Sequence, residues 1–73
     1  LDLLVMRNGR RYGFEFKLTD APAPTRSMHI ALADLHLDEI IVIHAGQESF
    51  PLSERIRAVS LQQATSQIEP LPA

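Results

Sequence analysis

Residues 1–17 read LDLLVMRNGRRYGFEFK, and this stretch determines how the fold begins. Asn8-Gly9 separates a mostly apolar run from a run with aromatic side chains at every second position. Asn-Gly favours a two-residue β-hairpin, because both residues tolerate the positive φ angles of a type I′ turn. We therefore predict an antiparallel hairpin in which Arg7 pairs with Arg10.

The two faces of this hairpin differ in character, because side chains alternate along a strand. One face pairs apolar with aromatic residues: Leu1 with Phe16, Leu3 with Phe14, and Val5 with Tyr12. The other face carries Asp2 opposite Glu15, with Lys17 two residues further on. We expect the apolar face to pack on a helix and the charged face to hold any chemistry.

The next part of the chain predicts a helix and a buried strand. Residues 19–24 contain two prolines and form a connector. Residues 25–37 have apolar side chains at helical spacing, and residues 40–45 form a β-branched run typical of a strand buried on both faces. Strand, helix and strand in succession predict a right-handed crossover between parallel strands.

Near the end of the chain, residues 56–59 predict a short strand, and Ser60 with Gln63 resembles a capping box that opens a helix through about Ile68. The fold class we predict is α/β. A mixed β-sheet opens with an antiparallel hairpin, and a crossover helix, packed on the aromatic face of the hairpin, leads to a parallel strand. Residues 1–69 would form one domain and residues 70–73 a C-terminal tail.

Composition excludes several functional classes. The chain has 73 residues and no cysteine, which rules out a disulfide scaffold, a cysteine-ligated metal site and a thiol nucleophile. No apolar run approaches the length of a membrane span, so we expect a cytoplasmic protein without a membrane partner. The chain starts at Leu1 inside a strand-like run, and we expect it to be part of a longer polypeptide.

The net charge of −2 argues against nucleic-acid binding by bulk electrostatics. A local contact could still come from arginines at the hairpin tip and the helix start, namely Arg7, Arg10, Arg11 and Arg26. The alternative for these side chains is simple solvation. The aromatic stripe of the hairpin could stack bases, but its alternation favours core packing.

Asp2, Glu15 and Lys17 are the candidate catalytic residues. Two carboxylates on neighbouring strands suit a hard divalent cation such as Mg²⁺, and a lysine beside them could hold water or phosphate. This set favours phosphodiester hydrolysis. The alternative is a surface ion pair between Asp2 and Lys17, with Glu15 solvated. A second metal hypothesis rests on His29, His36 and His44, which lack an acidic neighbour at ligand spacing.

The order Asp2-Leu3-Leu4, hairpin turn, Glu15-Phe16-Lys17 resembles the core of the PD-(D/E)XK nuclease superfamily. More closely, nearly the whole chain resembles the C-terminal domain of bacterial and archaeal AAA-type ATPases. The resemblance implies a truncated restriction-endonuclease-like core, with Asp2 and Glu15 as metal ligands and Lys17 as the catalytic lysine. It also implies an upstream helix, and an upstream ATPase module that binds ATP.

Two functions follow from the resemblance. The first is a Mg²⁺-dependent nuclease-like domain with DNA as its partner. The second is a non-catalytic regulatory or protein-interaction module of the ATPase, in which the fold survives as a scaffold. The sequence leaves both open, because many members of this superfamily keep the fold without demonstrated cleavage.

Overall fold

The hairpin around Asn8-Gly9 forms as predicted in the computed structural model, which describes residues 1–19 and 21–63. Asn8 and Gly9 have φ angles of 52° and 78°, as a type I′ turn requires. The strands are β1 (Leu3–Arg7) and β2 (Arg10–Lys17). Their pairs run from Arg7 opposite Arg10 to Leu3 opposite Phe14, which confirms the predicted register over β1.

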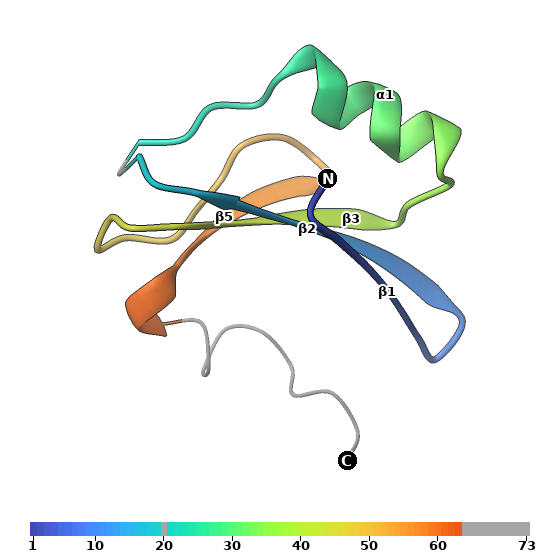
Figure 1. Cartoon of the computed structure of the whole chain (residues 1–73), viewed down its shortest axis with the longest axis horizontal. Coiled ribbons are helices and arrows are strands. Elements are labelled where there is room, and N and C mark those ends of the chain that lie inside the picture. The colour runs from blue at the N-terminus through green and yellow to red at the C-terminus, as the bar shows by residue number, and fades with distance from the viewer. Residues whose placement is uncertain (20, 64–73) are drawn as a thin grey trace.

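The hairpin is part of a mixed sheet of five strands, in the order β1-β2-β3-β5-β4 (Figure 1). The helix α1 (Arg26–Asp34) connects β2 to β3 (Glu39–His44), and the two strands are parallel, as predicted. The strand β5 (Ile56–Ser60) is parallel to β3 on its other side. A two-residue strand, β4 (Phe50–Pro51), pairs antiparallel with β5 at the far edge.

Local signals set both ends of α1. Thr25 is the N-cap, and its side chain accepts a hydrogen bond from the Met28 N–H. At the other end His36 adopts a φ of 52°, and the Leu37 N–H donates to the Leu32 carbonyl at 3.0 Å. This is a Schellman motif with histidine in the left-handed position, so the helix ends earlier than the predicted residue 37.

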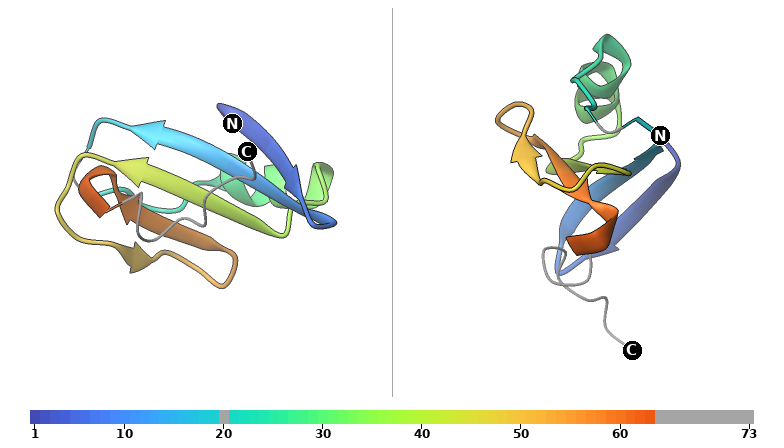
Figure 2. Two further views of the ribbon diagram at one scale, coloured as in Figure 1. Left: turned by 90° about the horizontal axis from the view of Figure 1, so that it is seen from below. Right: turned by 90° about the vertical axis from the view of Figure 1, so that its left-hand side faces the viewer.

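The prediction that α1 packs on the aromatic face of the hairpin is wrong. Figures 1 and 2 show α1 on one side of the sheet only. Its core partners there are Ile40, Val42 and Ile56, which share a face with Gly13 and Glu15 of β2. Phe14 instead packs with apolar residues on the opposite face, which we call the open face: Ile41, Ile43 and Val59.

Gly13 of β2 leaves room for two leucine side chains on the helix side of the sheet. A Cβ atom built there would lie 2.8 Å from Leu1 Cδ1 and 2.9 Å from Leu37 Cδ1. Both leucine side chains therefore fill the space that glycine leaves on the helix side of β2. Leu1 consequently does not sit opposite Phe16 on the open face, and the register prediction fails at this residue.

The last described element is a 3-10 turn, η1 (Leu61–Gln63), directly after β5. The predicted helix through Ile68 and the tail at residues 70–73 lie outside the described residues. Within residues 1–19 and 21–63, no helix is long and apolar enough to cross a membrane.

Candidate functional site

Asp2, Glu15 and Lys17 meet where β2 ends. The carboxyl end of a parallel strand is the usual place for a site in an α/β sheet. Glu15 and Lys17 lie on the helix side of the sheet, next to Val42 and His44 of the neighbouring strand. Glu15 and Lys17 form an ion pair, whereas the Asp2 side chain reaches β2 at the Phe16 N–H, so these interactions differ from those expected.

Glu15 is the most enclosed member of the site. Its side chain is 12% exposed, and Oε2 is buried without a hydrogen-bond partner within the described part of the chain. The Lys17 ammonium lies 3.5 Å from this oxygen, which makes an ion pair but a poor hydrogen bond. The backbone nitrogen of Leu1 lies 3.5 Å from Oε1. Glu15 is thus neither solvated nor fully satisfied.

Asp2 departs from the regular ladder. Its N–H donates to the Phe14 carbonyl at 2.9 Å, and its Oδ2 accepts a hydrogen bond from the Phe16 N–H at 2.8 Å. That N–H would donate to a carbonyl of the first strand if the antiparallel ladder continued. The Asp2 carboxylate is therefore anchored at the strand end between Glu15 and Lys17 and keeps one oxygen for other partners. The alternative was a diagonal Asp2–Lys17 ion pair with Glu15 solvated; in the described part of the chain Lys17 pairs with Glu15.

The carboxylate oxygens of Asp2 and Glu15 are suitable ligands for a magnesium ion. Mg²⁺ is commonly held by one or two carboxylates, with water and substrate phosphate completing its shell. The under-satisfied Glu15 Oε2 and the exposed Asp2 carboxylate supply such a pair. Within residues 1–19 and 21–63, no group of three or more His, Cys, Asp or Glu residues could hold a metal ion. The site would therefore need water or substrate oxygens as further ligands.

The predicted nucleic-acid contacts do not gather around this site. Arg10 and Lys17 stand at opposite ends of β2, about 23 Å apart for seven residues of strand. Arg11 has a structural role, since its Nε donates to the Leu35 carbonyl at 2.9 Å and its N–H to Asp38 at 2.8 Å. Arg26 is exposed at the start of α1.

Arg10 interacts with the aromatic ring beside it on the open face. Its Nε donates to the Tyr12 hydroxyl at 3.1 Å, and the guanidinium lies 5.8 Å from the ring centroid. The hydrogen bond with Tyr12 raises the pKa of Arg10 above its usual value. Arg10 is therefore a fixed positive charge at the hairpin end of the sheet.

His44 is a buried polar residue that the sequence analysis did not assign to the main site. It is 2% exposed and pairs in register with Lys17. Its Nδ1 accepts a hydrogen bond from the Gly46 N–H at 3.0 Å, so the ring is neutral with its proton on Nε2. That Nε2 is buried without a hydrogen-bond partner among the described residues. His29 is exposed on α1 and His36 lies beyond it, so the three histidines do not form one site.

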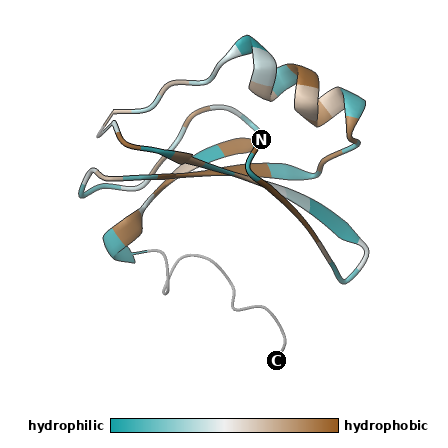
Figure 3. Ribbon diagram, in the orientation of Figure 1, coloured by the Kyte–Doolittle hydropathy of each residue, from teal (hydrophilic) through white to brown (hydrophobic). Residues whose placement is uncertain are grey.

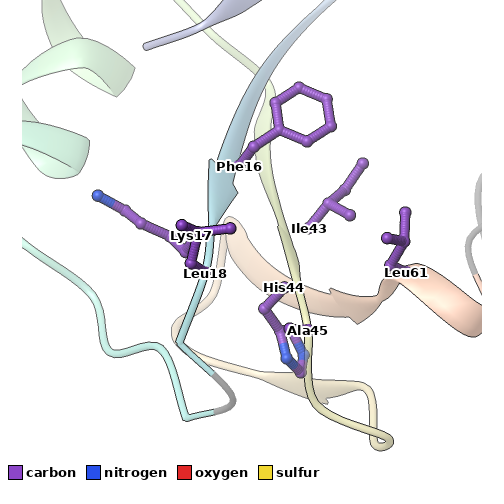
Figure 4. A pocket seen from close by; sticks show the side chains of 7 residues that line it. All are labelled: Phe16, Lys17, Leu18, Ile43, His44, Ala45 and Leu61. Carbon is purple, nitrogen blue, oxygen red and sulfur yellow. The ribbon is translucent and has the colours of Figure 1, made fainter.

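An apolar pocket of about 150 Å³ lies beside the site, at the same end of the sheet (Figure 4). Phe16, Ile43 and Leu61 line it together with Leu18, which is 98% exposed. Figure 4 shows the ammonium of Lys17 directed away from these side chains. Lys17 and His44 also line the pocket, which therefore lies where β2 and β3 end and borders the site through Lys17, while neither carboxylate lines it.

Comparisons with known proteins give two relatives from mycobacteria. The chain is 46% identical over 63 residues to uncharacterized protein Rv2008c of Mycobacterium tuberculosis and to uncharacterized protein Mb2031c of Mycobacterium bovis. The match covers 86% of this chain but only 14% of each relative. No family model and no solved structure matches.

Proposed function

We propose that this chain is a PD-(D/E)XK-like domain that hydrolyses phosphodiester bonds in DNA with the help of Mg²⁺. The observation that carries the proposal is the largely enclosed Glu15 carboxylate, whose Oε2 has no hydrogen-bond partner among the described residues, with the Lys17 ammonium at 3.5 Å and Asp2 anchored on the Phe16 N–H. By the resemblance described above, the domain would belong to a cytoplasmic ATPase whose ATP site lies in an upstream module.

Each side chain has a defined part in this chemistry. Glu15 and Asp2 would hold the cation, which would activate a water molecule and neutralise charge developing on the phosphate. Lys17 donates hydrogen bonds to the attacking water or to a phosphate oxygen, and its positive charge stabilises the transition state. The Phe16 N–H fixes the orientation of Asp2, so the carboxylate is positioned before any ligand arrives.

Metal binding can be tested cleanly because Lys17 is the only lysine of the chain. In a sample labelled with ¹³C-lysine, we expect Mg²⁺ to cause a saturable shift of the single side-chain signal at millimolar concentration. Glu15→Gln should abolish this shift. Glu48→Gln, which removes an exposed carboxylate on the loop before β4, is the matched control and should leave it unchanged. A folded chain that shows no shift overturns the metal site.

Cleavage is the second part of the test. We expect the 73-residue chain to cleave DNA with Mg²⁺, and we expect Lys17→Met and Asp2→Asn to abolish cleavage while Glu48→Gln retains it. Calorimetric titration should show that Lys17→Met still binds Mg²⁺, because lysine is not a ligand. Cleavage that persists in Lys17→Met would contradict the assigned role of the lysine.

A non-catalytic regulatory or interaction module of the ATPase is the second candidate. It is favoured by the interactions within the site, since Asp2 accepts a backbone N–H and Glu15 pairs with Lys17. These contacts stabilise the end of β2 without any ligand. This function predicts a folded chain that neither binds Mg²⁺ nor cleaves DNA.

A further inference from the structure

The two edge strands of the sheet differ in how well they are protected against pairing with a further strand. At one edge β4 has only two residues, and one of them is Pro51. At the other edge β1 has five residues, LLVMR, without lysine, proline or an acidic side chain. Long apolar edges without such features tend to pair with another strand.

The side chains of β1 are also unusually exposed for their type. Leu3 is 50% exposed, Leu4 40% and Met6 65%. They point alternately to the helix side and to the open face, so both surfaces next to this edge are apolar. Figure 3 shows β1 coloured as hydrophobic along much of its length. No described strand or helix pairs with the outer side of β1.

The hairpin register identifies which backbone groups are available. Arg7 and Arg10 flank a two-residue loop and form a hydrogen-bonded pair, and such pairs recur at every second residue. The N–H and C=O groups of Val5 and Leu3 therefore point toward β2. Those of Leu4 and Met6 point outward, away from the sheet.

The outer side of β1 is complementary to itself. In an antiparallel arrangement with a two-fold axis at Val5, Leu4 of each copy lies opposite Met6 of the other, so the outward groups of both strands pair. Asp2 precedes the strand and Arg7 ends it, so antiparallel pairing places Asp2 of one copy at the same end of the paired strands as Arg7 of the other, whereas in-register parallel pairing would place Arg7 opposite Arg7.

We propose that β1 is an interaction edge that pairs antiparallel with β1 of a second copy of this chain, so that two sheets become one continuous sheet. This inference is independent of the proposed nuclease function. Sedimentation velocity of the 73-residue chain should give a mass that rises with concentration from 8.2 kDa toward twice that value. Because the interface is small, we expect a dissociation constant on the order of 100 µM.

Variants distinguish this edge from the other apolar surfaces. Leu4→Lys should weaken dimerisation at least tenfold, whereas Ile30→Lys, at a 47% exposed position on α1, should not. A chain that stays monomeric at millimolar concentration overturns the proposal. A dimer that persists in Leu4→Lys but dissociates in Phe16→Lys also overturns it and assigns the contact to the open face.

Backbone measurements keep the test valid if Leu4→Lys does not fold. Met6→Pro removes an outward N–H, a change that edge strands tolerate, together with the Met6 sulfur that accepts a hydrogen bond from Arg11 at 3.8 Å. It should weaken the dimer while the chain remains folded. In the unmodified chain, amide exchange of Leu4 and Met6 should slow as concentration rises, while that of Val5 stays constant. Exchange of all three amides that is independent of concentration contradicts the proposed pairing.

Discussion

Replacing Lys17 by methionine tests whether Glu15 depends on its ion pair. The Lys17 ammonium lies 3.5 Å from Glu15 Oε2, and the two side chains are 43% and 12% exposed. Methionine keeps most of the apolar stem of lysine and removes only the charge. The substitution leaves Glu15 as a largely enclosed carboxylate, with the backbone nitrogen of Leu1 3.5 Å from its Oε1.

The size of the effect follows from two contributions that both lower the stability of the variant. At this distance the Coulomb attraction is about 5 kcal/mol for an effective dielectric constant of about 20. Solvent screening reduces it strongly because Lys17 is nearly half exposed, and exposed pairs typically contribute about 0.2–1 kcal/mol. Leaving an enclosed carboxylate without its partner adds a desolvation cost of about 1–3 kcal/mol. We therefore expect Lys17→Met to lower the free energy of unfolding by about 1–4 kcal/mol.

The assay is urea unfolding followed by circular dichroism, on four chains that form a double-mutant cycle. Glu15→Gln should change the free energy of unfolding by less than about 0.5 kcal/mol, because it removes the charge that needs compensation. The double variant should be no less stable than Glu15→Gln alone. N-terminal acetylation of each chain removes the charge of the Leu1 nitrogen and should increase the effect of Lys17→Met.

A different order of stability among these four chains would refute this reasoning. If Lys17→Met leaves stability unchanged and the coupling in the cycle is zero, Glu15 is solvated in solution. The case for Glu15 as an under-satisfied metal ligand would then lose its physical basis. A greater loss from Glu15→Gln than from Lys17→Met would also contradict it, because the carboxylate would then be stabilising for a reason other than Lys17.

Three further substitutions test the fold, each by thermal and urea unfolding. Thr25→Ala removes the hydroxyl that accepts the Met28 N–H and should lower the free energy of unfolding by about 1 kcal/mol. An unchanged stability would mean that this helix cap does not form in solution. His36→Gly should stabilise the chain by about 0.5–1 kcal/mol, because His36 has a φ of 52°, which glycine adopts without strain. The control His29→Gly, inside α1, should cost about 1 kcal/mol. A loss of stability in His36→Gly would contradict the Schellman motif. Phe14→Ala should cost about 3–5 kcal/mol, enough to unfold so small a domain, and an unaltered melting temperature would show that Phe14 is not in the open-face core.

The candidate site was only partly predictable. The period of two along β2 places Glu15 and Lys17 on the same face of the strand, and this could be predicted from the local sequence. The partner of each charge was not predictable, since Asp2 leaves the ladder and binds the Phe16 N–H. The Nε2 of His44, which has no hydrogen-bond partner within residues 1–19 and 21–63, gave no sequence signal either, because its burial depends on elements far along the chain.

The sequence by itself determined the hairpin, its type I′ turn, the helix and the parallel β3, because each depends on residues close together in the chain. Only the tertiary structure decided which face of the sheet α1 covers. β3 is apolar on both faces and accepts a helix on either side. The space above Gly13, filled by Leu1 and Leu37, belongs to the helix side, so the aromatic residues of β2 lie on the open face instead. That choice arises from packing across the whole sheet, and no local pattern encodes it.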